Sequence, residues 1–96
     1  MVTKEGLHKT LGTYLKTKRQ QLGLTQAEVA KKLSYASPQF ISNFERGLCS
    51  PPLKNLKTLV NLYQIPVDEI MNLMLKEQEI ILRTALSPTA DKKIVN

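Results

Sequence analysis

Large apolar residues recur at helical intervals along most of the chain and divide it into five segments. Between residues 7 and 22 they fall at Leu7, Leu11, Tyr14, Leu15 and Leu22, a spacing that predicts one buried helix face. Four further helices are predicted: one from about 25 to 33, one over 38–46, one after Ser50-Pro51-Pro52 that Ile65-Pro66 ends, and one over 68–86. The pattern therefore predicts an all-α fold of five helices with an extended C-terminal helix.

The residues between these segments are those that begin and end helices. Gly23 suits a helix C-terminus, where the backbone often needs a positive φ. Thr25 and Glu28 have the spacing of a capping box, in which each side chain bonds the other residue's backbone N–H. Ser37 before Pro38 predicts an N-cap followed by the first helical residue, and Gly47 ends that helix.

Ninety-six residues form one domain, or one domain with a modest appendage. We expect a body over residues 1–66, with its two central helices at about 25–46, and a C-terminal helix and tail over residues 67–96. Charge follows the same division. Residues 1–66 hold ten basic and three acidic side chains, whereas residues 67–96 hold four basic and five acidic ones. A basic body predicts a polyanionic partner, although a solvated basic surface explains the charge equally well.

The sequence lacks the residues that several classes of function need. The chain has one histidine, His8, and one cysteine, Cys49, so it can form neither an internal disulfide nor an ordinary zinc site. It also has no glycine-rich phosphate loop. We therefore expect no enzyme activity, no catalytic residue, no metal and no cofactor. No apolar run is long enough for a signal sequence or a membrane span, which leads us to expect a soluble, cytoplasmic protein.

The third predicted helix carries hydrogen-bonding side chains on its outer side. Ile41 and Phe44 should be buried, which leaves Gln39, Ser42, Asn43 and Arg46 mostly outward. Glutamine and asparagine offer a donor and an acceptor on one planar group, and this pattern matches adenine N6 and N7 in the major groove. Two short helices joined by a tight turn, with such a second helix, predict a helix-turn-helix that binds double-stranded DNA.

Three stretches in order resemble one family: Gly23-Leu24-Thr25-Gln26-Ala27-Glu28-Val29-Ala30, then Ile41-Ser42-Asn43-Phe44-Glu45-Arg46-Gly47, then Pro51-Pro52 and a leucine-rich helix. From Arg19 to Ile70 the chain resembles the Cro/cI-type (XRE) helix-turn-helix domain of bacterial and phage regulators. The resemblance implies a lambda-repressor-like fold that binds operator DNA, usually as a dimer, to regulate transcription.

The resemblance also implies roles for individual residues. The DNA-binding set would be Gln26 on a phosphate, Ser37, Gln39 and Asn43 toward the groove, Ser42 and Arg46 nearer the backbone, and Pro38 at a position that often carries a base-reading side chain. Arg19 and Glu45 would form an internal ion pair and stay off the DNA. The link between the two helices is one residue longer than the commonest family pattern and lacks its turn glycine.

The C-terminal helix is apolar over more of its circumference than its own domain can cover. Its candidate interface residues are Met71, Met74, Leu75, Ile80, Ile81 and Leu82. The simplest partner is a second copy, because a homodimer places two recognition helices about one DNA turn, ~34 Å, apart on a palindrome.

A dimeric, sequence-specific repressor is the leading interpretation. An antitoxin-type module that neutralises another protein and binds DNA for autoregulation is the alternative. A bridging coactivator with weak, sequence-independent DNA affinity is the third.

Overall fold

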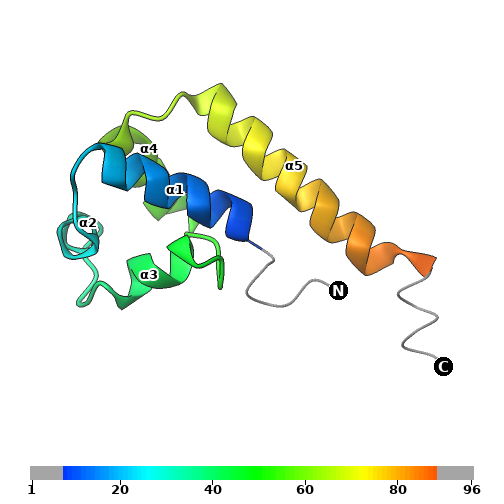
Figure 1. Ribbon diagram of the computed structural model, residues 1–96, viewed down its shortest axis with the longest axis horizontal. Coiled ribbons are helices and arrows are strands. Elements are labelled where there is room, and N and C mark those ends of the chain that lie inside the picture. Colours follow the sequence, from blue (N-terminus) through cyan, green and yellow to red (C-terminus); the bar gives the residue numbers. More distant parts are fainter. Residues whose placement is uncertain (1–7, 89–96) are drawn as a thin grey trace.

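The computed structural model describes residues 8–88, and this part of the chain consists of helices without a strand. The five helices are α1 (Lys9–Gln21), α2 (Gln26–Lys32), α3 (Gln39–Glu45), α4 (Leu53–Tyr63) and α5 (Val67–Leu86). The first four pack into a body, and α5 leaves it as a long rod (Figure 1). The all-α, five-helix prediction is confirmed over the described residues; Leu7, expected in the first helix, lies outside them.

Local signals in the sequence set the start of α2. Gly23 has a φ of 70° and ends the α1 region, as the C-terminal glycine predicted. The Thr25 hydroxyl then accepts from the Glu28 N–H at 3.0 Å, and the Glu28 carboxylate accepts from the Thr25 N–H at 2.9 Å. The capping box is therefore confirmed, and its hydrogen bonds from Thr25 lower the pKa of Glu28.

The link between α2 and α3 has a serine in a backbone conformation that glycine adopts more easily. Ser34 has a φ of 62°, a left-handed conformation that costs an L-residue about 1 kcal/mol or more. The Ser37 hydroxyl accepts from the Gln39 N–H at 3.0 Å and so caps the next helix. Regular α3 runs from Gln39 to Glu45, one residue shorter at each end than predicted; Pro38 already has helical angles, and Gly47 turns the chain at a φ of 79°.

One aliphatic core joins the body to the first turn of α5. Its members come from all five helices and from the residues that follow α2 and α4. They are Leu11, Leu15, Val29, Ala30, Leu33, Ile41, Phe44, Leu56, Leu59, Tyr63, Ile65 and Ile70. Burial of Ile41 and Phe44 in this core confirms which side of α3 faces inward, and the opposite side is left for other contacts.

Gly12 allows α1 to cross α3 at very short range. A Cβ atom at this position would lie 2.5 Å from the Phe44 carbonyl oxygen and 2.6 Å from the Glu45 carbonyl oxygen. Both neighbours are backbone atoms, which cannot rotate away. Glycine here therefore sets the distance between α1 and the C-terminal turn of α3.

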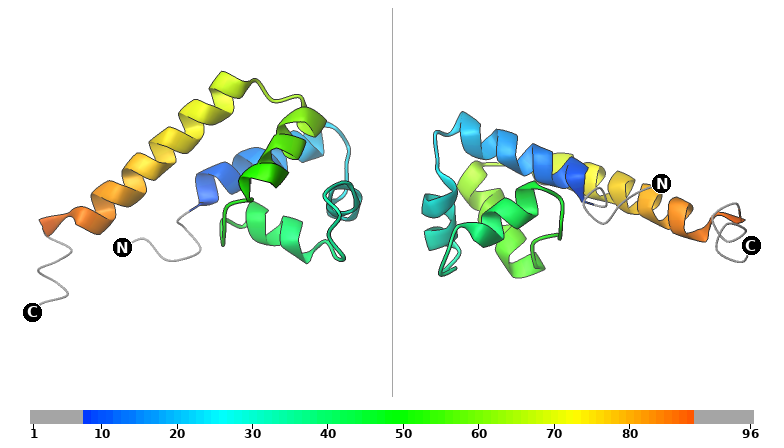
Figure 2. Two further views of the ribbon diagram at one scale, coloured as in Figure 1. Left: turned by 180° about the vertical axis from the view of Figure 1, so that it is seen from behind. Right: turned by 60° about the horizontal axis from the view of Figure 1, so that its bottom comes forward.

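The inner half of α5 lies along α1, and its outer half extends past the end of α1 (Figure 2). The buried carboxylate of Glu77 accepts from the Leu11 N–H at 3.4 Å, in the first turn of α1. Nearer the body, the Tyr14 hydroxyl donates to Glu69, and Lys18 lies 3.8 Å from the same carboxylate. Polar contacts thus hold α5 against α1 up to Glu77.

Candidate nucleic-acid interface

A buried ion pair ties α1 to the end of α3. The Arg19 Nε atom donates to Glu45 Oε2 at 2.6 Å, and a second guanidinium nitrogen donates to Glu45 Oε1 at 3.0 Å. The third guanidinium nitrogen, Nη1, donates to the Leu24 carbonyl oxygen at 2.7 Å. The hydrogen bonds that Arg19 donates to the Glu45 carboxylate raise the pKa of Arg19 against the opposing effect of burial. This bidentate geometry fixes the C-terminal end of α3 relative to α1.

Gln26 joins the same network. Its Nε2 atom donates to Glu45 Oε1 at 2.9 Å, so that one carboxylate holds the start of α2, the end of α3 and α1 together. Gln26 is half-buried in consequence. Sequence reasoning assigned Gln26 only to a phosphate; the structure adds an internal contact that positions its side chain.

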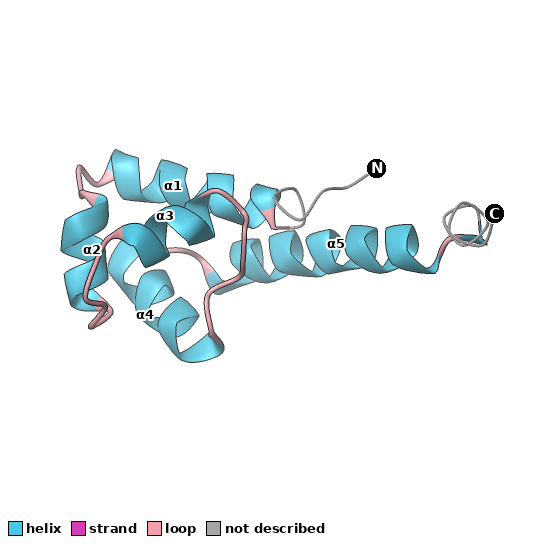
Figure 3. Ribbon diagram, turned by 90° about the horizontal axis from the view of Figure 1, so that it is seen from below, coloured by secondary structure: helices cyan, strands magenta, loops and turns pink. Residues whose placement is uncertain are grey.

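The outer side of α3 presents two amides joined to each other. The Gln39 Nε2 atom donates to Asn43 Oδ1 at 2.9 Å, across one helical turn. Gln39 is exposed, while Ser42 and Asn43 are half-buried on either side of the same surface. In Figure 3, α3 lies toward the viewer with α1, α2 and α4 around it. The exposure of Gln39 shows that the side with the two amides is open.

The remaining sequence-predicted residues lie at the two ends of α3. Ser37 is half-buried and Pro38 exposed at the N-terminal end, and Arg46 is exposed immediately after the C-terminal end. The structure thus gathers Ser37, Pro38, Gln39, Ser42, Asn43 and Arg46 on or beside one seven-residue helix.

Sequence reasoning missed an aromatic pair next to this surface. Phe40 is exposed, and its ring stacks on Tyr35 with centroids 4.5 Å apart and planes 13° apart. Tyr35 comes from the link before α3 and accepts a hydrogen bond from Asn55 of α4. The signal was a second aromatic residue, directly after Gln39, in a short helix whose predicted core residues were Ile41 and Phe44.

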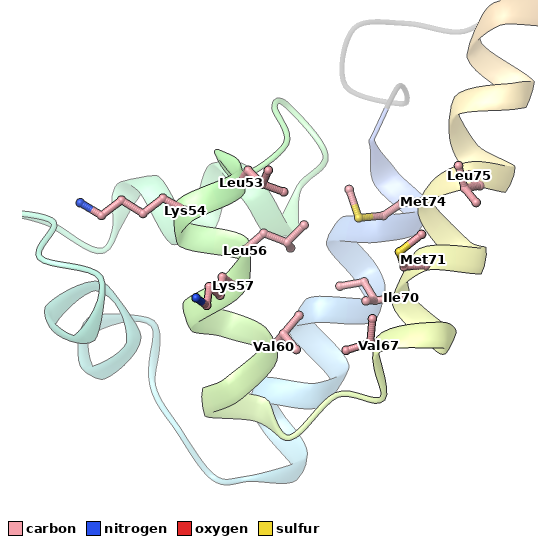
Figure 4. Close-up of a pocket in the computed structure, with 10 residues that line it drawn as sticks. All are labelled: Leu53, Lys54, Leu56, Lys57, Val60, Val67, Ile70, Met71, Met74 and Leu75. Carbon is pink, nitrogen blue, oxygen red and sulfur yellow. The ribbon is translucent and has the colours of Figure 1, made fainter.

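A second surface is the apolar groove between α4 and α5, of about 650 Å³. Figure 4 shows Leu56 and Val60 of α4 turned toward Ile70 and Val67 of α5, while the Lys54 side chain extends away from α5. Of the α5 residues predicted for an interface, Met71, Leu75, Ile80 and Leu82 are exposed, and Met74 and Ile81 are half-buried.

A sequence model of the helix-turn-helix family matches residues 15–70, which include α2, α3 and the buried ion pair. This match covers more than half of the chain. The chain belongs to the XRE family of helix-turn-helix proteins. Membership agrees with the lambda-repressor-like, all-α fold of five helices. The matched range contains α2 and α3, the two helices that the sequence predicts for the motif.

A curated relative agrees with the family. Over 62 residues the chain is 39% identical to the HTH-type transcriptional regulator ImmR of Bacillus subtilis (strain 168). The alignment covers 65% of this chain and 48% of ImmR, so the XRE-family chain matches about half the length of its relative.

Residues 8–88 lack two other kinds of site. No group of three or more histidine, cysteine, aspartate or glutamate side chains is arranged to hold a metal ion in this range. No helix in the same range has the length and apolarity needed to cross a membrane.

Proposed function

We propose that this XRE-family protein is a cytoplasmic, sequence-specific transcriptional repressor that inserts α3 into the major groove of a palindromic operator. The observation that carries the proposal is the amide pair of Gln39 and Asn43 on the open side of α3. The pair uses a Gln39 donor and an Asn43 acceptor, and it retains the Gln39 Oε1 acceptor and the Asn43 Nδ2 donor. Adenine offers the matching pattern, an N6 donor beside the N7 acceptor.

In this proposal, the residues around the pair fix the helix on the DNA backbone. We assign Gln26, Ser42 and Arg46 to phosphates, and Ser37 and Pro38 to the rim of the groove. Such contacts position a protein without reading sequence. Exposed lysines on α2, Lys31 and Lys32, add to the attraction for the polyanion.

The test is selection of DNA sites from a random library, followed by binding titrations over a series of salt concentrations. Wild type is compared with Gln39→Ala plus Asn43→Ala, and with a control that removes the same residue types from α1 and α4, Gln20→Ala plus Asn61→Ala. We expect the first pair to weaken binding to the selected site by tenfold or more, because each bidentate amide contact contributes about 1–3 kcal/mol. The salt dependence should change little, because phosphate contacts remain. Equal losses in both double variants, or no enriched site, would overturn the proposal.

The homodimer is supported by a stripe of apolar residues along α5. Val67, Met71, Leu75, Leu82 and Leu86 are all exposed, and their spacing keeps them near one side of the helix. The first three line the groove with α4, and Leu82 and Leu86 continue the stripe beyond the body. A single chain thus has an apolar groove at one end of α5 and exposed leucines at the other.

A two-fold pair brings these surfaces together. If two α5 helices run antiparallel with their stripes fully overlapped, the outer end of each lies beside the groove of the other, and Met71 is opposite Leu82 of the second copy. The helix has 20 residues, about 30 Å of overlap at ~1.5 Å per residue.

Cysteine cross-linking tests this register in a Cys49→Ser background. Mixing a Met71→Cys protein with a Leu82→Cys protein should give a disulfide-linked pair faster than either protein alone. Thr84→Cys, which lies on another side of the same exposed turn, is the matched control. A molecular mass corresponding to a monomer at the concentrations that bind DNA would contradict the homodimer. The groove between α4 and α5 would then be assigned to the alternative function, an antitoxin-type contact with another protein.

Repression is the simplest consequence of a dimer seated across a promoter, because steric exclusion of polymerase requires no further surface. Transcription in vitro from a promoter that contains the selected site should fall when wild type is added. It should be unaffected by the Gln39→Ala plus Asn43→Ala variant. A rise in transcription would identify an activator.

A further inference from the structure

Phe40 is a large apolar side chain at the edge of the open side of α3, between that side and the buried face. Its exposed fraction is 46%, although it neighbours Gln39 in sequence and lies one helical turn from Asn43. Residues three apart on a helix are surface neighbours, so the ring is next to the amide pair. Whatever approaches the two amides therefore also approaches this ring.

The Phe40 ring is held in place rather than free to rotate into the solvent. One of its faces is covered by the Tyr35 ring, 4.5 Å away. Tyr35 is fixed in turn by a tilted contact with buried Phe44, at 6.1 Å between centroids, and by the hydrogen bond from Asn55. An aromatic ring with so little freedom loses little conformational entropy when it binds.

The edges of the bases offer one apolar group in the major groove, the C5 methyl of thymine. An A·T base pair presents the adenine pattern that the amides match and also carries this methyl. We propose that Phe40, held by Tyr35, reads a thymine C5 methyl in the operator. This inference rests on the proposed function, since it assigns one further base contact to the same helix.

The experiment replaces thymine by deoxyuridine, one position at a time, in the operator selected for wild type. This change removes the methyl and leaves the base-pairing edge intact. Burial of one methyl predicts that one position per half-site loses roughly threefold to fivefold in affinity. In Phe40→Ala the same replacement should have no effect, while the preference at the adenine positions should persist. The ratio of affinities for two DNAs is taken on one protein, so any change in the folded fraction cancels.

Leu22→Ala is the matched control, because Leu22 has the same exposed fraction, 46%, and lies after α1 instead of on α3. It should keep the full sensitivity to deoxyuridine. A thymine methyl that contributes equally in wild type and in Phe40→Ala would overturn the inference, as would an operator that tolerates deoxyuridine at every position. Failure to select any operator would instead count against the proposed function.

Discussion

The body of the protein and the outer half of α5 use similar residues in opposite ways. In the body, leucine and isoleucine side chains meet one another in a closed core, and the charged residues inside it are paired. Beyond Glu77, α5 carries Ile80, Leu82 and Leu86 in the open, and its ion pair between Glu79 and Arg83 lies at the surface. The same types of contact are therefore stabilising in one region and nearly neutral in the other. The difference is the one expected if the body supports itself and the outer half of α5 packs against a partner, as proposed above.

Charge substitutions should give the largest contrast. Glu45→Gln leaves Arg19 buried without its carboxylate, and we expect the free energy of unfolding to fall by about 3–5 kcal/mol. Glu79→Gln breaks an exposed i,i+4 pair of 2.8 Å and should cost less than about 0.5 kcal/mol. Urea denaturation of both variants checks the contrast. Equal losses would show that the outer half of α5 is as well supported as the body.

Truncations of apolar side chains in the two regions should depend differently on protein concentration. Leu59 is 2% exposed, and Leu59→Ala should destabilise the protein by about 2–5 kcal/mol at every protein concentration. Leu86 is 72% exposed, and Leu86→Ala should have little effect in dilute solution. If the outer half of α5 pairs with a second copy, the destabilisation by Leu86→Ala should grow as the protein concentration rises. A constant effect of Leu86→Ala would argue against pairing at this position.

Tyr14 tests the junction between the two regions. Burial, followed by the hydrogen bond to Glu69 and that residue's charge, raises the pKa of Tyr14 to about 12. A phenol whose pKa is raised in the folded state contributes stability below its ordinary pKa of 10.0, and this contribution is lost as pH rises toward about 12. Tyr14→Phe should cost about 0.5–1.5 kcal/mol at neutral pH and remove this part of the alkaline destabilisation. Unfolding curves of both proteins from pH 8 to 12 would measure it. An unchanged pH profile would mean that the bond to Glu69 contributes nothing.

The smallest expected effect is a gain. Ser34→Gly relieves the left-handed backbone of the α2–α3 link and should raise the free energy of unfolding by about 0.5–1 kcal/mol. Ser87→Gly, at a φ of −65° after α5, is the control and should give no gain. Thermal unfolding measures both. A loss at Ser34 would show that its side chain has a role beyond this turn.

Features that depend on neighbouring residues could be predicted from the sequence. The capping box at Thr25, the turn at Gly23 and the extent of α5 follow from residues a few positions apart, and the structure confirms them. The inward positions of Ile41 and Phe44 follow from helical periodicity in the same way. The absent turn glycine was noticed in the sequence, but only the backbone angle showed that Ser34 adopts the left-handed conformation in that link.

Features that depend on distances between helices could not be predicted. In the sequence, Gly12 is only a residue of low helix propensity. The structure shows that the carbonyl groups of α3 lie against it. Phe40 reads as core until its ring is seen on Tyr35, which comes from outside the helix. Glu77 reads as one more surface charge on an amphipathic helix, although its carboxylate is buried against an amide 66 positions away. In each case the contact joins groups that come from different elements, and a single sequence gives no sign of their proximity.

Leu11 and Gly12 are consecutive residues, and each makes a backbone contact with a different helix. The amide of Leu11 is bonded to Glu77 of α5, and Gly12 is pressed against the carbonyl groups of α3. The first turn of α1 is therefore a joint between the helix proposed to pair and the helix proposed to read DNA. In a two-fold pair, the tilt of one α5 against the other would be transmitted through this joint to the angle between the two recognition helices. The separation of half-sites that such a protein accepts would then be set in the first turn of α1, far from any base, and operators lengthened or shortened by one base pair would measure how stiff the joint is.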